Sequence, residues 1–185
     1  MFTENNNYCE VIITPQPPKM AKVLNLLYIA LAVVSALMGL LMSPLLLLLI
    51  FLCLFMRKLT LAKLNYKLEY QFWGRQLDVE MITGDDKRKN IGTYHLDKLK
   101  LMAKEDDPAL ETARKELAGK NLRIFDLTDH NPVGTDVYIM LMDEGAEVLE
   151  VHIQPSREML RKMWQVAFRA VRIPKELKTA DAESL

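Results

Sequence analysis

The sequence is poor in the residue types that usually carry catalysis, metal binding or covalent cross-linking. Its two cysteines, Cys9 and Cys53, lie in the polar N-terminal segment and in a long apolar run, which indicates neither a disulfide framework nor a metal site. Its three histidines, His95, His130 and His152, show no paired spacing such as His-Glu-x-x-His. Gly-x-x-x-x-Gly-Lys loops, Gly-x-Gly-x-x-Gly turns and Gly-x-Ser-x-Gly elbows are absent as well. We therefore expect a protein that is not an enzyme and that uses no cofactor, no metal and no small-molecule substrate.

One catalytic alternative rests on a short polar stretch. Asp126, Asp129 and His130 stand close together in the sequence, and carboxylates beside an imidazole are the groups of an acid/base or metal cluster. The same Asp-His-Asn-Pro stretch is more commonly a solvated turn, and this is the interpretation that we favour.

Net charge is also absent, since 24 basic and 24 acidic residues balance, and we expect no nucleic-acid partner. The charges are unevenly distributed, because no acidic residue occurs between Val11 and Leu68. Basic residues in that stretch flank the apolar run, and such a collar is attracted to anionic lipid by about 1 kcal/mol per charge. Its ordinary role is to orient membrane segments.

The apolar run occupies residues 23–56 and contains no charged residue. At about 1.5 Å per residue its roughly 34 residues would form a helix near 50 Å long, whereas a bilayer core of about 30 Å needs about 20 residues. Gly39, Ser43 and Pro44 are the only turn-forming residues near its middle. We predict a transmembrane helical hairpin over residues 20–62, with spans at about 20–40 and 44–61.

The charges around this hairpin predict its topology, because lysine and arginine prefer the cytoplasmic side of a membrane. We predict a multi-pass protein of the cell membrane with both termini in the cytoplasm. This topology places every flanking basic residue on the cytoplasmic side: Lys19, Lys22, Arg57, Lys58, Lys63 and Lys67. Two other interpretations are weaker. A cleaved signal peptide would be shorter and nearer the N-terminus, and a soluble core would need more chain to cover both helices.

Beyond the hairpin, residues 65–174 predict one cytoplasmic domain of the α+β class. Apolar and polar residues alternate with a period of two, and turn residues interrupt the alternation. About seven antiparallel strands are expected near residues 66–73, 77–82, 91–95, 99–101, 121–128, 135–142 and 146–153. Residues 137–142 are apolar on both faces, which predicts a central strand covered from outside.

Two helices and two polar ends complete the predicted organisation. Asp107 and Gly119 bracket a short surface helix, and a closing helix is expected from Ser156 to Pro174. Residues 1–19 carry consecutive asparagines and then prolines, which favours a disordered or loosely attached arm. The alternative is that its apolar residues 11–13 pack on the domain or at the membrane interface. Residues 175–185 predict a polar tail.

Four strands, a helical excursion, three strands and a closing helix are the elements of a pleckstrin-homology-like (PH-like) domain. The sequence resembles an uncharacterised family of small bacterial membrane proteins. The resemblance lies in the stretches 66–72 and 77–82, Gly74, the basic cluster 87–89 and the helix start at 154–160. The resemblance implies a transmembrane hairpin followed by a PH-like antiparallel barrel or sandwich with a C-terminal capping helix. It implies no activity, because the fold serves many functions.

The candidate binding site consists of basic residues in two turns, which we expect to touch an anionic membrane surface or an acidic partner: Arg75, Lys87, Arg88 and Lys89. A solvated charged turn is the competing interpretation. The predicted function is that of a non-catalytic, membrane-anchored binding or scaffolding protein, with the lipid bilayer as its partner. The alternative is an accessory subunit of a membrane protein complex, or a homo-oligomer, assembled through small residues of the hairpin: Ala30, Ala32, Ser35, Ala36 and Gly39.

Overall fold

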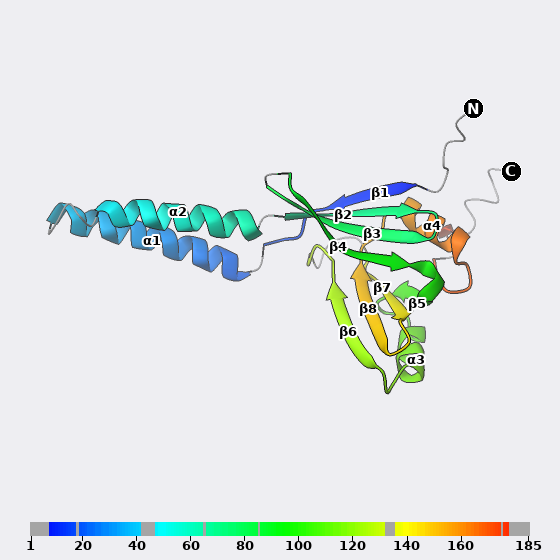
Figure 1. The fold of residues 1–185 in the computed structure, drawn as a ribbon. Helices are drawn as coiled ribbons and strands as arrows, with labels where there is room; N and C mark the ends of the chain where they lie inside the picture. The colour runs from blue at the N-terminus through cyan, green and yellow to red at the C-terminus, as the bar shows by residue number, and fades with distance from the viewer. Residues whose placement is uncertain are drawn as a thin grey trace, which may run out of the picture.

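The computed structural model describes residues 8–17, 19–41, 47–64, 66–84, 86–131, 136–174 and 176–177. The turn of the hairpin was expected around residues 39–44, of which residues 42–44 lie outside the described residues, as does the tail after residue 177. In chain order the elements are β1 (Cys9–Ile13), α1 (Lys19–Leu41), α2 (Leu47–Leu64), β2 (Tyr66–Trp73), β3 (Gln76–Thr83), β4 (Arg88–His95), β5 (Leu99–Lys104), α3 (Ala109–Glu116), β6 (Asn121–Asp126), β7 (Tyr138–Asp143), β8 (Glu147–Ile153) and α4 (Arg157–Val166). Figure 1 shows a long pair of helices, α1 and α2, that projects from one end of a body of strands.

The body contains two four-stranded sheets in the part of the chain that the structure describes. One sheet has the order β1-β2-β3-β4 and is antiparallel throughout, and the other has the order β5-β7-β8-β6. All seven expected strands form, but β6 runs parallel to β8, whereas an antiparallel set was expected. The reason is that the chain passes from β5 at one edge of the second sheet to β6 at the other edge, through α3. The fold is therefore of the α+β class, with two packed sheets in place of a single barrel.

The N-terminal arm differs most from the expectation. Residues 9–13 form β1, an edge strand that pairs antiparallel with β2, with Cys9 opposite Phe72 and Ile13 opposite Leu68. Cys9 is buried in the core, and Val11 and Ile13 pack against it. The prediction of a loosely attached arm is wrong for this segment, and the body of the protein begins at β1 rather than at residue 65. The two long helices are thus inserted between two neighbouring strands of one sheet (Figure 1).

The main core lies between the two sheets, where α4 also contributes Met159, Leu160 and Met163. Ser156 begins α4, because its hydroxyl accepts a hydrogen bond from the Met159 amide at 3.2 Å. A second cluster lies on the outer face of the second sheet, where Leu110 of α3 packs on the apolar side chains of β5 and β7. This cover explains why β7 is apolar on both faces, as predicted for a central strand.

The closing helix is shorter than expected, since α4 ends at Val166 rather than near Pro174. Beyond it the chain turns and extends along β5. The Met102 amide donates to the Ala170 carbonyl at 2.7 Å, and the Arg172 amide donates to the Met102 carbonyl at 2.8 Å. These hydrogen bonds to another strand replace those that a longer helix would have made.

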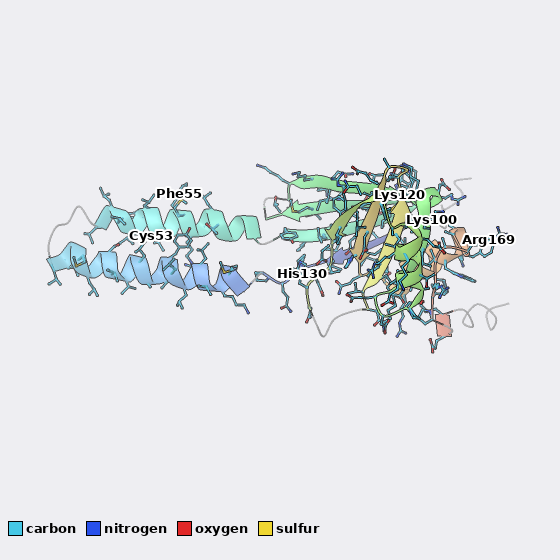
Figure 2. The ribbon with its side chains drawn as sticks, turned by 90° about the horizontal axis from the view of Figure 1, so that it is seen from below. Cys53, Phe55, Lys100, Lys120, His130 and Arg169 are labelled. Atoms are coloured by element: carbon cyan, nitrogen blue, oxygen red, sulfur yellow. The ribbon has the colours of Figure 1, made fainter. Side chains whose placement is uncertain are left out.

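The pair of long helices has small and polar residues inside and large apolar residues outside. Ala21, Ser35 and Gly39 of α1 and Cys53 of α2 are buried between the helices. Figure 2 shows Cys53 lying between α1 and α2, and Phe55 pointing away. The outward side chains are mostly leucine, valine, isoleucine, phenylalanine and methionine, and more than half of the Leu26, Val34, Leu40, Phe51 and Phe55 surfaces is exposed.

Polar side chains join the two helices near the body. The Arg57 Nε donates to the Asn25 side-chain oxygen at 2.6 Å, and the Tyr28 and Thr60 hydroxyls lie 3.4 Å apart. Among the described helices, one is long and apolar enough to cross a membrane by length and composition, namely α1 over residues 20–41. Two comparable spans were expected; α2 is less apolar because it includes Arg57, Lys58 and Lys63.

Candidate functional site

The end of the body next to the long helices gathers segments from distant parts of the chain. The register pairs Tyr66, at the start of β2, with Thr83, at the end of β3, so the turn between β3 and β4 lies where α2 enters the body. The segment 14–17 that leads from β1 to α1 lies at the same end, because Ile13 pairs with Leu68. We call this region the helix-proximal end (Figure 1).

The four basic residues of the predicted site do not come together. Lys87, Arg88 and Lys89 lie at the helix-proximal end, at the start of β4. Arg75 lies in the turn between β2 and β3, at the opposite end of the sheet, where its Nε is 2.9 Å from Asp97 Oδ1. The eight residues of β3 separate the two turns by about 25 Å at about 3.3 Å per residue. The two turns of the predicted site lie at opposite ends of the sheet, because successive turns of an antiparallel meander alternate between its two ends.

Arg88 is engaged within the body, whereas its neighbours are not. Its terminal nitrogen lies 2.7 Å from Glu69 Oε2 and 3.5 Å from Glu80 Oε2, and the Glu69 side chain is only 1% exposed. Lys87 and Lys89 are exposed and form no ion pair with any residue that the structure describes. Positive charge available to a partner therefore comes from these two lysines rather than from Arg88.

Glu69 belongs to a pair of carboxyl groups on the outer face of the first sheet. Burial raises the pKa of Glu69, and a hydrogen bond with Glu10 raises it further. The pKa of Glu10 is lowered by the same hydrogen bond and by a second one from the Tyr8 hydroxyl, which lies 2.8 Å away. With Arg88 across from them, these groups tie β1, β2 and the start of β4 together.

Lys67 lies at a site that the sequence did not predict. In the sequence it was only one of the basic residues that follow the apolar run. It is the second residue of β2 and is exposed. Its side chain lines a cavity of about 320 Å³ at the helix-proximal end, together with Thr14, Pro15, Pro17, Tyr66, Ile82, Thr83, Gly84 and Asp86. The strand period placed Lys67 on the outer face, but only the pairing with β3 and the position of segment 14–17 create the cavity.

Besides Lys67 of β2, the basic residues expected to flank a membrane lie in the ends of α1 and α2 next to the body: Lys19, Lys22, Arg57, Lys58 and Lys63. Lys22 and Lys58 are exposed, and Arg57 is held by Asn25. The side chains of Lys19 and Lys63 lie outside the described part of the chain. The charges therefore gather beside the helix-proximal end of the body.

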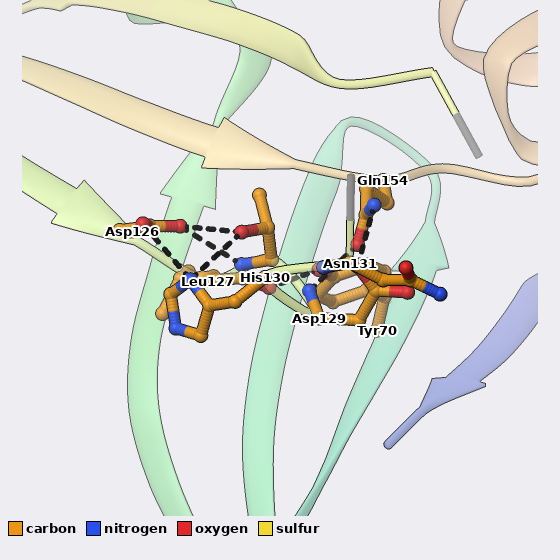
Figure 3. Close-up of polar contacts among 8 residues, drawn as sticks. Tyr70, Asp126, Leu127, Asp129, His130, Asn131 and Gln154 are labelled. Atoms are coloured by element: carbon orange, nitrogen blue, oxygen red, sulfur yellow. Dashed lines mark hydrogen bonds and ion pairs between the residues drawn. The ribbon is translucent and has the colours of Figure 1, made fainter. Parts of the chain in front are cut away.

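The polar stretch considered for catalysis, residues 126–130, forms a loop that is hydrogen-bonded to the rest of the domain (Figure 3). Asp126 Oδ1 accepts hydrogen bonds from the amide and the hydroxyl of Thr128, at 3.1 and 2.7 Å. Asp129 exchanges two hydrogen bonds with the buried Gln154, since its amide donates to Gln154 Oε1 at 2.7 Å and its Oδ1 accepts from Gln154 Nε2 at 2.9 Å. His130 Nδ1 lies 3.3 Å from Asp126 Oδ2. The carboxylates thus close the loop on itself, as in a turn.

This loop also fixes the segment that leads to α1. The Gln16 amide donates to the Asp129 carbonyl at 2.8 Å, and the Tyr70 hydroxyl donates to the Leu127 carbonyl. Figure 2 places His130 at the end of the body nearest α1. Over the described residues, no group of three or more His, Cys, Asp or Glu side chains is arranged to hold a metal ion.

Comparison with known proteins gives one match. A family model described as "Bacterial PH-like domain (DUF6106)" matches residues 5–173, which include β1, both long helices and the whole body. No curated protein and no solved structure matches the chain.

Proposed function

The chain belongs to this family of bacterial PH-like domains, and from that premise we propose that it is a membrane-anchored binding or scaffolding protein. In the proposal, α1 and α2 cross the cell membrane as a hairpin, both termini are cytoplasmic, and the PH-like body stands at the cytoplasmic surface. The role is binding rather than catalysis.

The observation that carries the proposal is the polarity of the helix pair. Water-soluble helix pairs bury apolar residues and expose polar ones, whereas α1 and α2 bury Ser35, Gly39 and Cys53 and expose large apolar side chains. In lipid there is no hydrophobic force between helices, so small residues that allow close approach lie at the interface. A Cβ atom on Gly39 would lie 2.7 Å from Leu47 Cδ2, which indicates how closely the helices approach. An apolar surface of this extent is a membrane or protein interaction surface.

The two connections between the helices and the body support a fixed orientation at the surface. One connection follows β1 and is held by the Gln16–Asp129 hydrogen bond, and the other enters β2 directly from α2. Because β1 and β2 are paired, both helices leave the body from one place. The helix-proximal end would then face the lipid headgroups.

The topology is tested with a reporter. Alkaline phosphatase inserted at Ser43 is expected to be active, because basic residues hold the helix ends next to the body in the cytoplasm and leave this position outside. The same reporter inserted at Gly145, in the turn between β7 and β8, is expected to be inactive and serves as the control. An inactive, stably expressed Ser43 fusion would contradict the hairpin.

Contact of Lys87 and Lys89 with anionic lipid is tested by reversing their charge. In the full chain, reconstituted in nanodiscs, backbone hydrogen exchange of residues 86–90 should be slower with phosphatidylglycerol present than with phosphatidylcholine alone. Changing both lysines to glutamate should remove that difference, since each lysine near an anionic surface contributes about 1 kcal/mol, or about fivefold. Arg88 is left unchanged, because a carboxylate there would stand beside buried Glu69.

The matched control reverses Lys100 and Lys115, which are exposed on the second sheet and on α3. The control should leave the lipid effect intact. If hydrogen exchange of residues 86–90 in the unmodified protein is the same with and without anionic lipid, contact of this turn with the membrane surface is contradicted.

The alternative role is that of an accessory subunit that binds another membrane protein through the outer faces of α1 and α2. Ser35 and Gly39 are used within the pair itself, while Ala30 is exposed and free to contact a neighbour. Crosslinking in native membranes separates the two roles, because a subunit should be recovered with a constant protein partner and a lipid-surface binder mainly alone.

A further inference from the structure

The cavity at the helix-proximal end is lined by both apolar and polar residues. Pro15, Pro17, Tyr66 and Ile82 supply apolar surface, and Pro15 is buried. Threonine, lysine and aspartate side chains supply the polar surface. The volume of about 320 Å³ lies at the lower end of the range for small-ligand sites, which is about 300–1,000 Å³.

Two charges of opposite sign line this cavity. Lys67 and Asp86 are both exposed, and neither forms an ion pair with a residue that the structure describes. Asp86 is held in place by its turn: its amide donates to the Thr83 carbonyl at 2.8 Å, and the Thr83 amide donates to the Lys87 carbonyl at 3.1 Å. Its φ of 54° is a left-handed conformation, which aspartate and asparagine adopt more readily than most residues.

We infer that this cavity binds the headgroup of a zwitterionic aminophospholipid, with Lys67 on the phosphate and Asp86 on the primary ammonium. The inference rests on the proposed function, which places the helix-proximal end at the headgroups. A purely anionic headgroup would be repelled by Asp86. A quaternary ammonium carries no N–H group and cannot donate a hydrogen bond to the carboxylate, so the site should distinguish phosphatidylethanolamine from phosphatidylcholine.

The test uses the full chain in nanodiscs that contain phosphatidylglycerol with either phosphatidylethanolamine or phosphatidylcholine, and lipids retained on release from the nanodisc are counted by native mass spectrometry. The unmodified protein should retain phosphatidylethanolamine about tenfold better than phosphatidylcholine, as expected for one hydrogen bond to a charged group. Asp86→Asn keeps the backbone conformation and should abolish this preference. Lys67→Gln should lower retention of both lipids alike, because both carry the phosphate.

Matched controls are Asp106→Asn and Lys100→Gln, at exposed positions outside the cavity, and both should behave as the unmodified protein. Equal retention of the two lipids by the unmodified protein, or a preference that survives Asp86→Asn, overturns the inference. Free O-phosphoethanolamine offers the same chemistry from a soluble source and should not displace the lipid at equal concentration. Displacement would assign the site to the soluble compound and overturn the lipid assignment.

Failure of this inference differs from failure of the proposed function. If the lipid preference is absent but exchange in the turn of Lys87 and Lys89 still depends on anionic lipid, only the headgroup assignment is wrong. If both effects are absent, the body does not contact the membrane at its helix-proximal end.

Discussion

Replacing Arg114 with alanine is expected to lower the free energy of unfolding of the body by about 2–3 kcal/mol. Arg114 projects from α3 and makes two hydrogen bonds to the carboxylate of Glu150 on β8, one from Nε at 3.0 Å and one from a terminal nitrogen at 2.5 Å. The Glu150 side chain is 5% exposed, so removal of arginine leaves a buried carboxylate without its charged partner. The cost is below that of a fully buried pair, because Arg114 itself remains partly exposed.

The loss should depend on pH in a defined direction. Burial alone would raise the pKa of Glu150, but hydrogen bonds from Arg114 and His152 outweigh burial and hold the pKa below its ordinary value. A carboxyl group with a depressed pKa stabilises the fold above its unfolded pKa of about 4.3, and this stabilisation disappears as the pH falls through the folded pKa. The unmodified protein and the Arg114→Ala variant should therefore converge in stability in acid.

Denaturant titration in detergent, followed by tryptophan fluorescence, measures both effects. Lys115→Ala, at the next and exposed position of α3, is the control and should cost less than about 0.5 kcal/mol. A loss of equal size at neutral and acid pH would show that Arg114 acts through packing rather than through its charge. The double variant Arg114→Ala, Glu150→Leu should recover part of the loss, because it removes the unpaired carboxylate.

Replacing Val11 with asparagine should destabilise the body by about 2–3 kcal/mol, and the same change at Ile12 should cost less than about 0.5 kcal/mol. The two residues are neighbours in β1, but Val11 packs against the core while Ile12 is 52% exposed. A loosely attached arm would tolerate both changes equally. Fluorescence-monitored unfolding of the two variants therefore tests whether β1 belongs to the sheet, and equal effects would contradict the pairing with β2.

All seven strands predicted after the hairpin form. They could be predicted because alternation with a period of two is a local property of each segment. β1 was missed for two reasons. It is only five residues long between asparagines and prolines, and its partner β2 lies beyond the long helices, more than fifty residues away. The early end of α4 was equally hidden, because residues 170 and 172 bond to Met102 on a distant strand.

Part of the candidate site could be predicted. The basic turn at residues 87–89 lies at the helix-proximal end, but Arg75 does not. Because successive turns of a meander alternate between the two ends of a sheet, the sequence could have predicted that Arg75 lies at the other end. The ion pair between Arg88 and Glu69 could not be predicted from the sequence. These residues are 19 positions apart, and they meet across strands that are not neighbours in the sheet.

A long apolar segment, flanked by basic residues and followed by strands of alternating polarity, can be recognised from the order of the residues alone. These properties add up residue by residue along the chain, so they need no knowledge of contacts. Three features become visible only in the folded chain: the helix pair is inserted between two paired strands, small and polar residues lie inside that pair, and Lys67 and Asp86 line one cavity. Each of these depends on residues far apart in sequence being brought together by strand pairing and packing, whose free energy belongs to the assembled fold rather than to any one segment.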